Sequence, residues 1–365
     1  MKTCAIILSV AYLIDRILGD PRYALHPVRL IGRLIAWVES CIRRLEWVSR
    51  AGGGLLWVVS VITVLGAYGV ARTALTGLHA MAPVVLDCFL VYSCIALRDM
   101  ERHAVPIAHA LNDSDTERAR ELLRGIVGRD VSKLDASGIA RAAIESVSES
   151  FLDGFLAPVC WFAAGAVAAH WLPLNPLPAA TGTILIYRVV NTLDSMVGYH
   201  SDHHRQLGWA SAQTDDAMNF IPARLALPLM VPAAVLCRLN ASAGWRIALR
   251  DRLKHASPNS AHTESFAAGA LGVRLGGPTV YAHGRVDKPW IGDGTDSPSD
   301  SHIIQACRLT ACAGWVSTVI AVILLGYISQ GAPHWGAMGG AAASLPADAE
   351  AGVPPVEVHG HGQGL

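Results

Sequence analysis

The sequence contains little charge and no excess of either sign. Asp, Glu, Lys and Arg together make up 16% of the 365 residues, whereas 52% are hydrophobic, which is too apolar for an ordinary soluble domain. The formal net charge is zero, so no bulk electrostatic attraction to nucleic acid is expected. The composition therefore indicates a protein that lies in a lipid membrane and has no nucleic-acid partner.

Three common sequence patterns are missing. The eight cysteines form no CxxC pair and most lie in apolar runs, so they are expected to be small buried hydrophobes, not zinc ligands or disulfides. No GxxxxGK[ST] motif is present, which excludes a Walker-type phosphate loop. Residues 1–18 resemble a signal peptide, but no A-x-A cleavage site follows them. We expect residues 1–18 to be retained as a first membrane segment.

Long hydrophobic segments are the dominant feature of the chain. Residues 52–71 and 309–329 are each long enough to cross a bilayer and contain no charged residue. Residues 220–236 carry three prolines, which favours a kinked or re-entrant segment. We predict an all-α integral membrane protein, a multi-pass helical bundle of about five to seven hydrophobic segments, one of them re-entrant. The weaker candidates, which contain a charge or a proline or are short, are residues 5–18, 81–97, 155–172, 177–190 and 220–236.

Polar modules separate these segments. Residues 98–149 have the pattern of soluble amphipathic helices, and residues 238–308 are rich in Gly, Pro, Ser and Asn, which indicates a region built from loops. The positive-inside rule places both modules, together with the arginine-rich residues 22–50, in the cytoplasm. Three candidate segments separate residues 98–149 from residues 238–308, and three crossings would put the two modules on opposite sides of the membrane. We therefore expect that residues 220–236 do not cross it and that the amino terminus lies outside. This topology gathers the polar motifs on the cytoplasmic face of a cell membrane.

The domain boundaries follow from the same composition. We predict one membrane domain over residues 1–337 and a disordered Gly/Ala/Pro tail over residues 338–365. His359 and His361 in the tail are a weak candidate metal pair, but an unstructured tail is the favoured interpretation.

The strongest local signal is a ladder of carboxylates beside an apolar segment. Glu145, Glu149 and Asp153 follow one another at i, i+4 and i+8, so one helix presents them on a single face, and Arg141 precedes them by the same step. Carboxylates at this spacing suit Mg²⁺, which binds through one or two carboxylates plus phosphate oxygens. The alternative is a solvated helix face with one Arg–Glu pair. The apolar residues that follow favour the functional interpretation, because carboxylates at a membrane boundary are costly.

Two further acidic clusters repeat this pattern. Asn191 and Asp194 share a helix face, as do Asp215 and Asn219, and each pair precedes or lies within an apolar stretch. Asp216 adjoins the second pair. Either cluster alone is a weak signal, but three in one chain indicate a site.

Donor groups for phosphate lie in the loop-rich module. Lys254, Ser257 and Asn259 precede or follow a proline turn, where backbone N–H groups and side chains can surround an anion. Ordinary turn chemistry is the alternative there. His26, which follows a Gly-Asp-Pro turn, is either a proton carrier or a structural histidine.

Taken together, the motifs resemble the adenosylcobinamide-phosphate synthase family, the CobD/CbiB proteins of cobalamin biosynthesis. The resemblance covers about residues 15–308, and the motifs stand in the family's order. One position departs from the pattern: the family usually has Glu-Asn where this chain has Glu149 and Ser150. The matching stretches are DRxLGDP…HPVRxIG, VGRD, RAxIESV, YRxxNTLDSMVGY, DDxxNxIPAR, SPNS, GALGVxLGGP and KPxIGDG.

The resemblance implies an integral membrane ligase with ATP and Mg²⁺. Such an enzyme joins the propionate carboxyl of adenosylcobyric acid to an amino-alcohol phosphate, typically aminopropanol phosphate, in an amide. A plausible route is an acyl phosphate, attacked by the neutral amine, with loss of phosphate. Other enzymes of the cobalamin pathway are expected partners, and the departure at Ser150 bears on substrate preference.

The residues above then receive expected roles. The carboxylates of Glu145, Glu149, Asp153, Asp194, Asp215 and Asp216 are candidates to hold Mg²⁺, with Glu149 and Asp153 also counted as catalytic. His255 or His26 is expected to deprotonate the incoming ammonium. The expected phosphate-binding set is Arg141, Arg188, Arg224, Arg250, Lys254, Ser257 and Asn259.

Two other functions remain open at this point. A membrane prenyltransferase would also use aspartate clusters and Mg²⁺, but Asn191-x-x-Asp194 is only a fragment of its usual motif. A membrane sensor similar to AmpE would lack the ligase role, and the long module at residues 250–294 argues against it.

Overall fold

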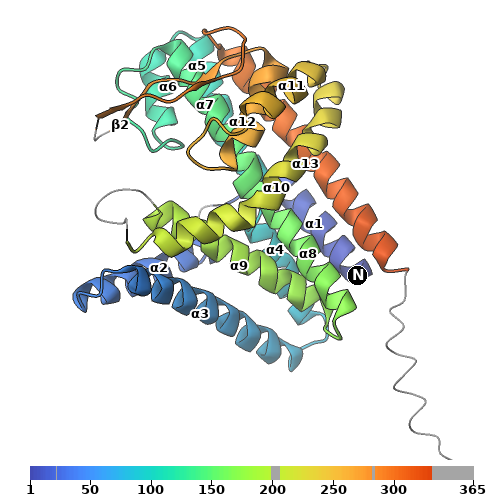
Figure 1. The fold of residues 1–365 in the computed structure, drawn as a ribbon. Coiled ribbons are helices and arrows are strands. Elements are labelled where there is room, and N and C mark those ends of the chain that lie inside the picture. Colours follow the sequence, from blue (N-terminus) through green and yellow to red (C-terminus); the bar gives the residue numbers. More distant parts are fainter. Residues whose placement is uncertain (22, 199–205, 282–283, 331–365) are drawn as a thin grey trace, which may run out of the picture. The chain divides into compact units, whose positions relative to one another are not determined.

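The computed structural model describes residues 1–21, 23–198, 206–281 and 284–330. The predicted tail over residues 338–365, with His359 and His361, lies outside the described residues. Helices dominate the described part, and the strands are short (Figure 1). The helices are α1 (Lys2–Leu18), α2 (Pro27–Arg44), α3 (Arg50–Thr76), α4 (Ala82–Ser93), α5 (Leu97–Asn112), α6 (Thr116–Leu123), α7 (Ala136–Phe151), η1 (Leu152–Leu156), α8 (Ala157–Trp171), α9 (Pro176–Val197), α10 (Trp209–Leu236), α11 (Ala241–Asp251), α12 (Ser260–Leu271) and α13 (Asp300–Ile328).

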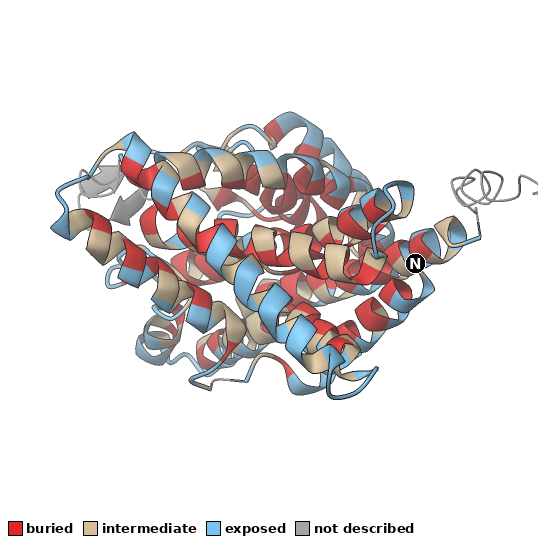
Figure 2. Ribbon diagram, turned by 90° about the horizontal axis from the view of Figure 1, so that it is seen from below, coloured by how far each residue is buried: buried red, intermediate tan, exposed pale blue. Residues whose placement is uncertain are grey.

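Four of these stretches are long and apolar enough to cross a membrane: α3, the continuous run from Ala136 to Trp171, α10 and α13. The apolar residues of α3 confirm this character, because Val58, Ile62 and Val70 are 42%, 64% and 73% exposed. Figure 2, viewed from the side on which α3 lies, shows exposed positions along the outer helix faces and buried positions towards the interior. Large apolar side chains exposed in this way match a lipid surface. The protein is a helical membrane protein, as predicted.

Helices α8 and α9 form a tightly packed antiparallel pair. A Cβ atom on Gly165 would lie only 2.1 Å from Thr183 Oγ1, so the two backbones approach as closely as a glycine permits. Small residues at such a contact are typical of helix packing in membranes. A four-residue turn, residues 172–175, joins the two helices, and the Asn175 side chain accepts a hydrogen bond from the Leu177 N–H at the start of α9.

Helix α10 differs from the prediction of a re-entrant segment. It continues unbroken from Trp209 to Leu236 through Pro222, Pro228 and Pro232. Prolines are tolerated in such a helix when neighbouring groups satisfy the freed carbonyls. Figure 1 shows α10 crossing α9 and α8 instead of running beside them.

The loop-rich module also contains more helix than predicted. Residues 238–308 include α11, α12 and the first turns of α13. Asn240 caps α11 through the Ala243 N–H, and Gly272 ends α12 in the left-handed conformation at φ 69°. Short antiparallel strands follow: β1 (Leu275–Gly276) pairs with β4 (Trp290–Ile291), and β2 (Thr279–Tyr281) pairs with β3 (Gly284–Val286).

Residues 124–135, which contain the VGRD motif, form no helix. Helix α6 ends at Leu123, and α7 begins at Ala136 behind Asp135, whose side chain accepts a hydrogen bond from the Gly138 N–H. Residues 124–135 therefore form a connection that brings Arg129 beside α7.

Candidate functional site

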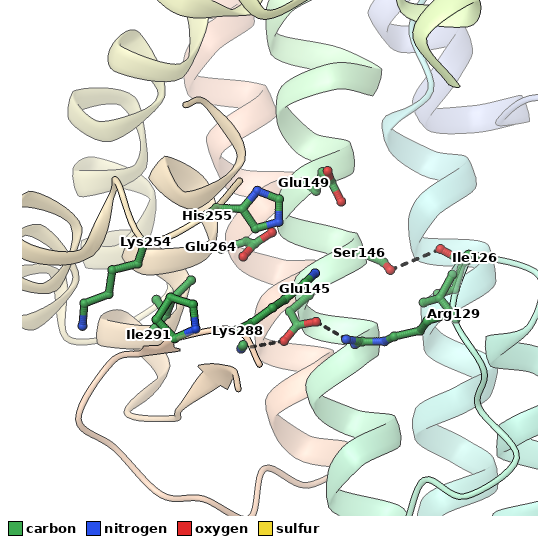
Figure 3. Close-up of a pocket in the computed structure, with 14 residues that line it drawn as sticks. Ile126, Arg129, Glu145, Ser146, Glu149, Lys254, His255, Glu264, Lys288 and Ile291 are labelled. Carbon is green, nitrogen blue, oxygen red and sulfur yellow. Dashed lines mark hydrogen bonds and ion pairs between the residues drawn. The ribbon is translucent and has the colours of Figure 1, made fainter. Parts of the chain in front are cut away.

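A cavity of about 320 Å³ opens where α7 meets α12 and the strand region. Figure 3 shows Glu149, Glu264 and His255 gathered on one side of the cavity, with Glu145 and Lys288 beside them and Lys254 further out. Charged groups from four separate parts of the chain therefore meet here. The lining residues are Ile126, Val127, Gly128, Arg129, Glu145, Ser146, Glu149, Lys254, His255, Glu264, Gly276, Lys288, Pro289 and Ile291.

Glu145 is fully engaged at the cavity wall. Its Oε2 pairs with an Arg129 guanidinium nitrogen at 2.6 Å, and its Oε1 accepts a hydrogen bond from the Gly276 N–H at 2.7 Å. Gly276 has φ 70°, and a Cβ there would lie 2.6 Å from the Pro289 carbonyl oxygen. Glycine is therefore required at the position that aims this N–H at Glu145.

Glu149 lies one helical turn further along α7, and its Oε1 accepts a hydrogen bond from the Ser260 hydroxyl at 3.3 Å. Ser260 is the first residue of α12, which also carries Glu264. Glu264 is only 4% exposed and lines the same cavity. The i, i+4 spacing of Glu145 and Glu149 thus places both side chains in one cavity, as predicted.

Burial changes the acid–base behaviour of two groups here. Burial raises the pKa of Glu264 well above its ordinary value, and the negative charges of Glu149 and Glu145 raise it further. Burial lowers the pKa of His255, although the charge of Glu149 opposes this effect. Both groups are therefore driven towards their neutral forms, and a cation held beside Glu264 would favour its carboxylate form.

Asp153 leaves the ladder formed by the two glutamates. The helix widens to the π form over Leu152–Leu156, a change of pitch that is frequent at functional sites. The Asp153 charge interacts with those of Asp215 and Asp194, on α10 and α9. The predicted single stripe therefore continues into a second acidic group in the helical bundle.

Hydrogen bonds tie this second group together. Asn219 donates to Asp215 Oδ2 at 2.9 Å, which confirms the predicted i, i+4 pair, and Asn191 donates to Asp215 Oδ1 at 3.4 Å. Arg188 donates to the carbonyl oxygens of Cys94 and Gly154, so this arginine fixes backbone around the group.

The segment before α12 connects the two groups. Ser257 donates to Asp216 Oδ1 at 3.1 Å, and the Asn259 side chain donates to the Asp216 carbonyl oxygen at 2.8 Å. The next residue, Ser260, reaches Glu149 in the cavity. Ser257 and Asn259 thus hold α10 against the cavity segment.

Several predicted anion-binding residues have structural partners. Arg141 donates to the carbonyl oxygens of Arg274 and Asp296 and stacks on the Trp290 ring at 4.8 Å. Arg250 pairs with Asp251 and Asp293.

Two others, Arg224 and Lys254, lie outside the cavity or at its margin, and the predicted proton carrier His26 also lies outside it. Arg224 lies over the Phe220 ring at 3.3 Å. Lys254 lines the cavity but its ammonium pairs with Asp251 at 2.8 Å. His26 pairs with Asp20 at 2.7 Å and is not among the residues that line the cavity.

The sequence interpretation missed three charged residues that line the cavity: Arg129, Lys288 and Glu264. Arg129 and Lys288 stand in motifs that were noticed, VGRD and KPxIGDG, but neither was assigned a role. Glu264 carries no periodic signal, because the polar residues of α12 are confined to its first six positions, and every residue from Ser260 to Leu271 is buried.

The acidic residues could hold a metal ion only with help from a ligand. Within the described residues, no group of three or more His, Cys, Asp or Glu side chains is arranged to hold a metal by itself. Mg²⁺ bound to a phosphate needs only one or two protein carboxylates, because phosphate oxygens and waters complete its shell. One or two of the carboxylates of Asp153, Asp194 and Asp215, which lie in electrostatic range of one another, would suffice for such an ion.

Comparison with known proteins identifies the family. The sequence model described as CobD/Cbib protein matches residues 8–310. The chain belongs to the CobD/CbiB family. It is 44% identical to the cobalamin biosynthesis protein CobD of Pelobacter propionicus over 292 residues. This stretch covers 79% of this chain and 84% of that protein.

Enterobacterial relatives are similar over a longer stretch. The chain is 40% identical over 319 residues to Klebsiella pneumoniae CobD, covering 86% of this chain and 94% of that protein. It is 40% identical over 320 residues to Salmonella typhimurium CbiB, covering 87% and 94%. No solved structure matches the chain. The CobD/CbiB match spans both acidic groups and the cavity, and places the protein in cobalamin biosynthesis.

Proposed function

We propose that this CobD/CbiB protein is an adenosylcobinamide-phosphate synthase. In this reaction the propionate carboxyl of adenosylcobyric acid forms an amide with an amino-alcohol phosphate such as aminopropanol phosphate. The observation that carries the proposal is the cavity at α7 and α12, where carboxylates and cations meet within the region that matches the family. Amide formation needs both kinds of group, because one substrate carries an ammonium and both carry anionic groups.

Bound ATP and Mg²⁺ would supply the phosphoryl group and the charge neutralisation that turn a carboxylate into an acyl donor. We assign Mg²⁺ binding to one or two carboxylates of the group formed by Asp153, Asp194 and Asp215, because phosphate oxygens and waters would complete the shell of the ion.

The cavity and the acidic group are joined by the Ser257–Ser260 segment, so the two parts of the reaction have adjacent places. A cavity of about 320 Å³ lies at the small end of the range for ligand sites, and it suits a small amine better than a corrinoid macrocycle. The corrinoid would present its carboxyl at the mouth. Restricting water there protects an activated carboxyl from hydrolysis.

The proposed location is the cell membrane, with the site on the cytoplasmic side. The cavity is lined by residues of the polar modules 98–149 and 238–308, which the positive-inside rule assigns to the cytoplasm. Cytoplasmic ATP would have direct access to such a site. The prenyltransferase and AmpE-like alternatives lack any comparable support, since the family match is to cobalamin biosynthesis proteins.

The proposal is tested with purified protein in detergent, adenosylcobyric acid, MgATP and aminopropanol phosphate, with the amide product detected by mass spectrometry. We expect ATP-dependent product from the wild type and a loss of at least about 100-fold in Glu149→Gln, the range for removing one charged group from an active site. Glu117→Gln is the matched control, because Glu117 lies on the surface of α6 with its side chain 84% exposed. Well-folded wild-type protein that forms no amide would refute the synthase assignment.

A further inference from the structure

The charges that line the cavity do not all cancel within the protein. Arg129 and Glu145 form one ion pair, and Lys254 forms another with Asp251. Glu149 and Glu264 remain, and the hydroxyl of Ser260 is a neutral partner for the first of them. Two carboxyl groups from different helices, α7 and α12, therefore share the cavity, and Lys288 is a further lining residue whose charge acts on Glu264.

Glu264 is the more unusual of the two. Its side chain is 4% exposed, and although the charges of Lys288 and Arg129 act on it, its carboxyl group has no hydrogen-bond partner among the described residues. Buried polar groups in folded proteins nearly always have such a partner. Figure 3 shows Glu264 pointing into the cavity next to His255 and Glu149. A ligand with several N–H donors and a positive charge would satisfy this position.

His255, the base expected from the sequence, is poorly placed to accept a proton. Its Nδ1 accepts a hydrogen bond from the Ser257 N–H at 3.1 Å. The neutral ring therefore carries its proton on Nε2, which makes that nitrogen a donor. His255 thus faces the cavity as a donor to an anion, and the carboxyl groups are the acceptors for a cation.

We propose that Glu264, together with Glu149, binds the ammonium group of the amino-alcohol phosphate in this cavity. An ammonium has three N–H donors and a compact charge, so two carboxylates from different helices can hold it at a fixed point. The Nε2–H of His255 and the ammonium of Lys288 supply a donor and a positive charge for the phosphate end of the same molecule. This inference rests on the proposed synthase function and names the residues that select its amine substrate.

The test measures binding to the full-length protein in detergent by calorimetry, without ATP or corrinoid. Three probes separate the two ends of the ligand: aminopropanol phosphate, isopropyl phosphate, which lacks the ammonium, and magnesium chloride alone. We expect Glu264→Gln to weaken aminopropanol phosphate binding about 10- to 100-fold, the usual range for a hydrogen bond to a charged group. The same variant should leave isopropyl phosphate binding unchanged within about 3-fold.

Controls separate recognition from misfolding. Glu149→Gln should show the same selective loss, and Glu117→Gln should bind both phosphates as the wild type does. Unfolding temperatures show whether a variant is simply unstable. If Glu264→Gln is unstable, Glu264→Asp, which keeps the charge, is used in its place. Glu264→Asp should weaken aminopropanol phosphate binding less than Glu149→Gln does.

The outcomes are distinct from those of the synthase test. Equal loss of both phosphates in Glu264→Gln, or no loss of either, overturns the ammonium assignment even if the wild type forms the amide. Magnesium binding to the wild type that disappears in Glu264→Gln also overturns it, because the glutamates would then be metal ligands. Wild-type protein that binds aminopropanol phosphate selectively but forms no amide would keep the assignment and refute the synthase.

Discussion

At the scale of single residues, Gly276 shows how backbone conformation supports the cavity. It has φ 70°, and its N–H donates to Glu145. Gly272 has a nearly identical φ of 69°, but a Cβ there would meet nothing within 4 Å. Substituting both glycines therefore distinguishes two effects on stability. Both positions show the effect of a side chain in the left-handed conformation, but only Gly276 adds a close contact.

Gly276→Ala is expected to be more harmful than Gly272→Ala. The left-handed conformation costs a side chain roughly 1 kcal/mol at either position. At Gly276 the new Cβ would also lie 2.6 Å from the Pro289 carbonyl oxygen, so β1 has to move and the N–H turns away from Glu145. Unfolding temperature and amide formation should both fall in Gly276→Ala, whereas Gly272→Ala should lose stability but keep activity. Equal effects would mean that the contact with Pro289 is unimportant.

Residue patterns predicted the contacts between residues close together in the sequence, but not those between residues far apart in it. Glu145 and Glu149 were found because their spacing alone places them on one face of α7. Arg129 stands in the VGRD motif and reaches Glu145, a contact that the sequence cannot specify without the path of residues 124–135. Glu264 could not be found at all, since a polar residue in an entirely buried helix leaves no periodic pattern.

At the scale of elements, α11 is fastened to the strand region by Asp251. This buried carboxylate accepts hydrogen bonds from Arg250 at 2.8 Å and from the Gly292 N–H at 2.9 Å, and it pairs with Lys254. Burial alone would raise the pKa of Asp251, but the hydrogen bonds from Arg250, Gly292 and Lys254 prevail and lower it well below its ordinary value. The charged form of Asp251 therefore stabilises the fold.

This contribution should disappear in acid. The pKa of Asp251 is lower in the folded than in the unfolded chain, so between the two values the unfolded chain binds more protons. The stabilisation is complete above the unfolded pKa of about 4 and is lost as the pH falls below it. Asp251→Asn should lower stability at pH 7 by roughly 1–3 kcal/mol and make the decline below pH 4 shallower. Unfolding temperatures measured from pH 7 to pH 3 check this, with the exposed Asp113→Asn as control; parallel curves for all three proteins would contradict it.

Helices were predicted better from the length of an apolar run than from the content of Gly, Pro and Ser in a segment. The sequence predicts α3 and α13 correctly, because an uncharged apolar run of that length almost always forms a membrane-spanning helix. Residues 238–308 were taken as loops from their Gly, Pro and Ser content, but Asn240 and Gly272 delimit real helices within them. The π segment at Leu152–Leu156 has no sequence signal, so the departure of Asp153 from the ladder could not be foreseen.

At the scale of the whole molecule, the arrangement of turns relates the fold to a membrane orientation. Met1, Arg72, Val84 and Asn175 line one shared cavity, so the amino terminus, the α3–α4 turn and the α8–α9 turn lie at the same end of the bundle. Those turns, residues 77–81 and 172–175, contain no Lys or Arg. The functional cavity lies among segments that carry Arg129, Lys254 and Lys288.

This difference in charge predicts which end faces the cytoplasm. Short loops without Lys or Arg are those that are exported, and basic segments stay inside. A cysteine introduced at Leu78 or Leu174, both exposed in their turns at 78% and 58%, should react with a membrane-impermeant maleimide in intact cells. A cysteine at Asp113, at the exposed end of α5, should react only after the membrane is opened. The parental chain, whose eight native cysteines are buried or half-buried, gives the background. The reverse labelling pattern would place the cavity outside, away from cytoplasmic ATP, and would count against the synthase as well as the orientation.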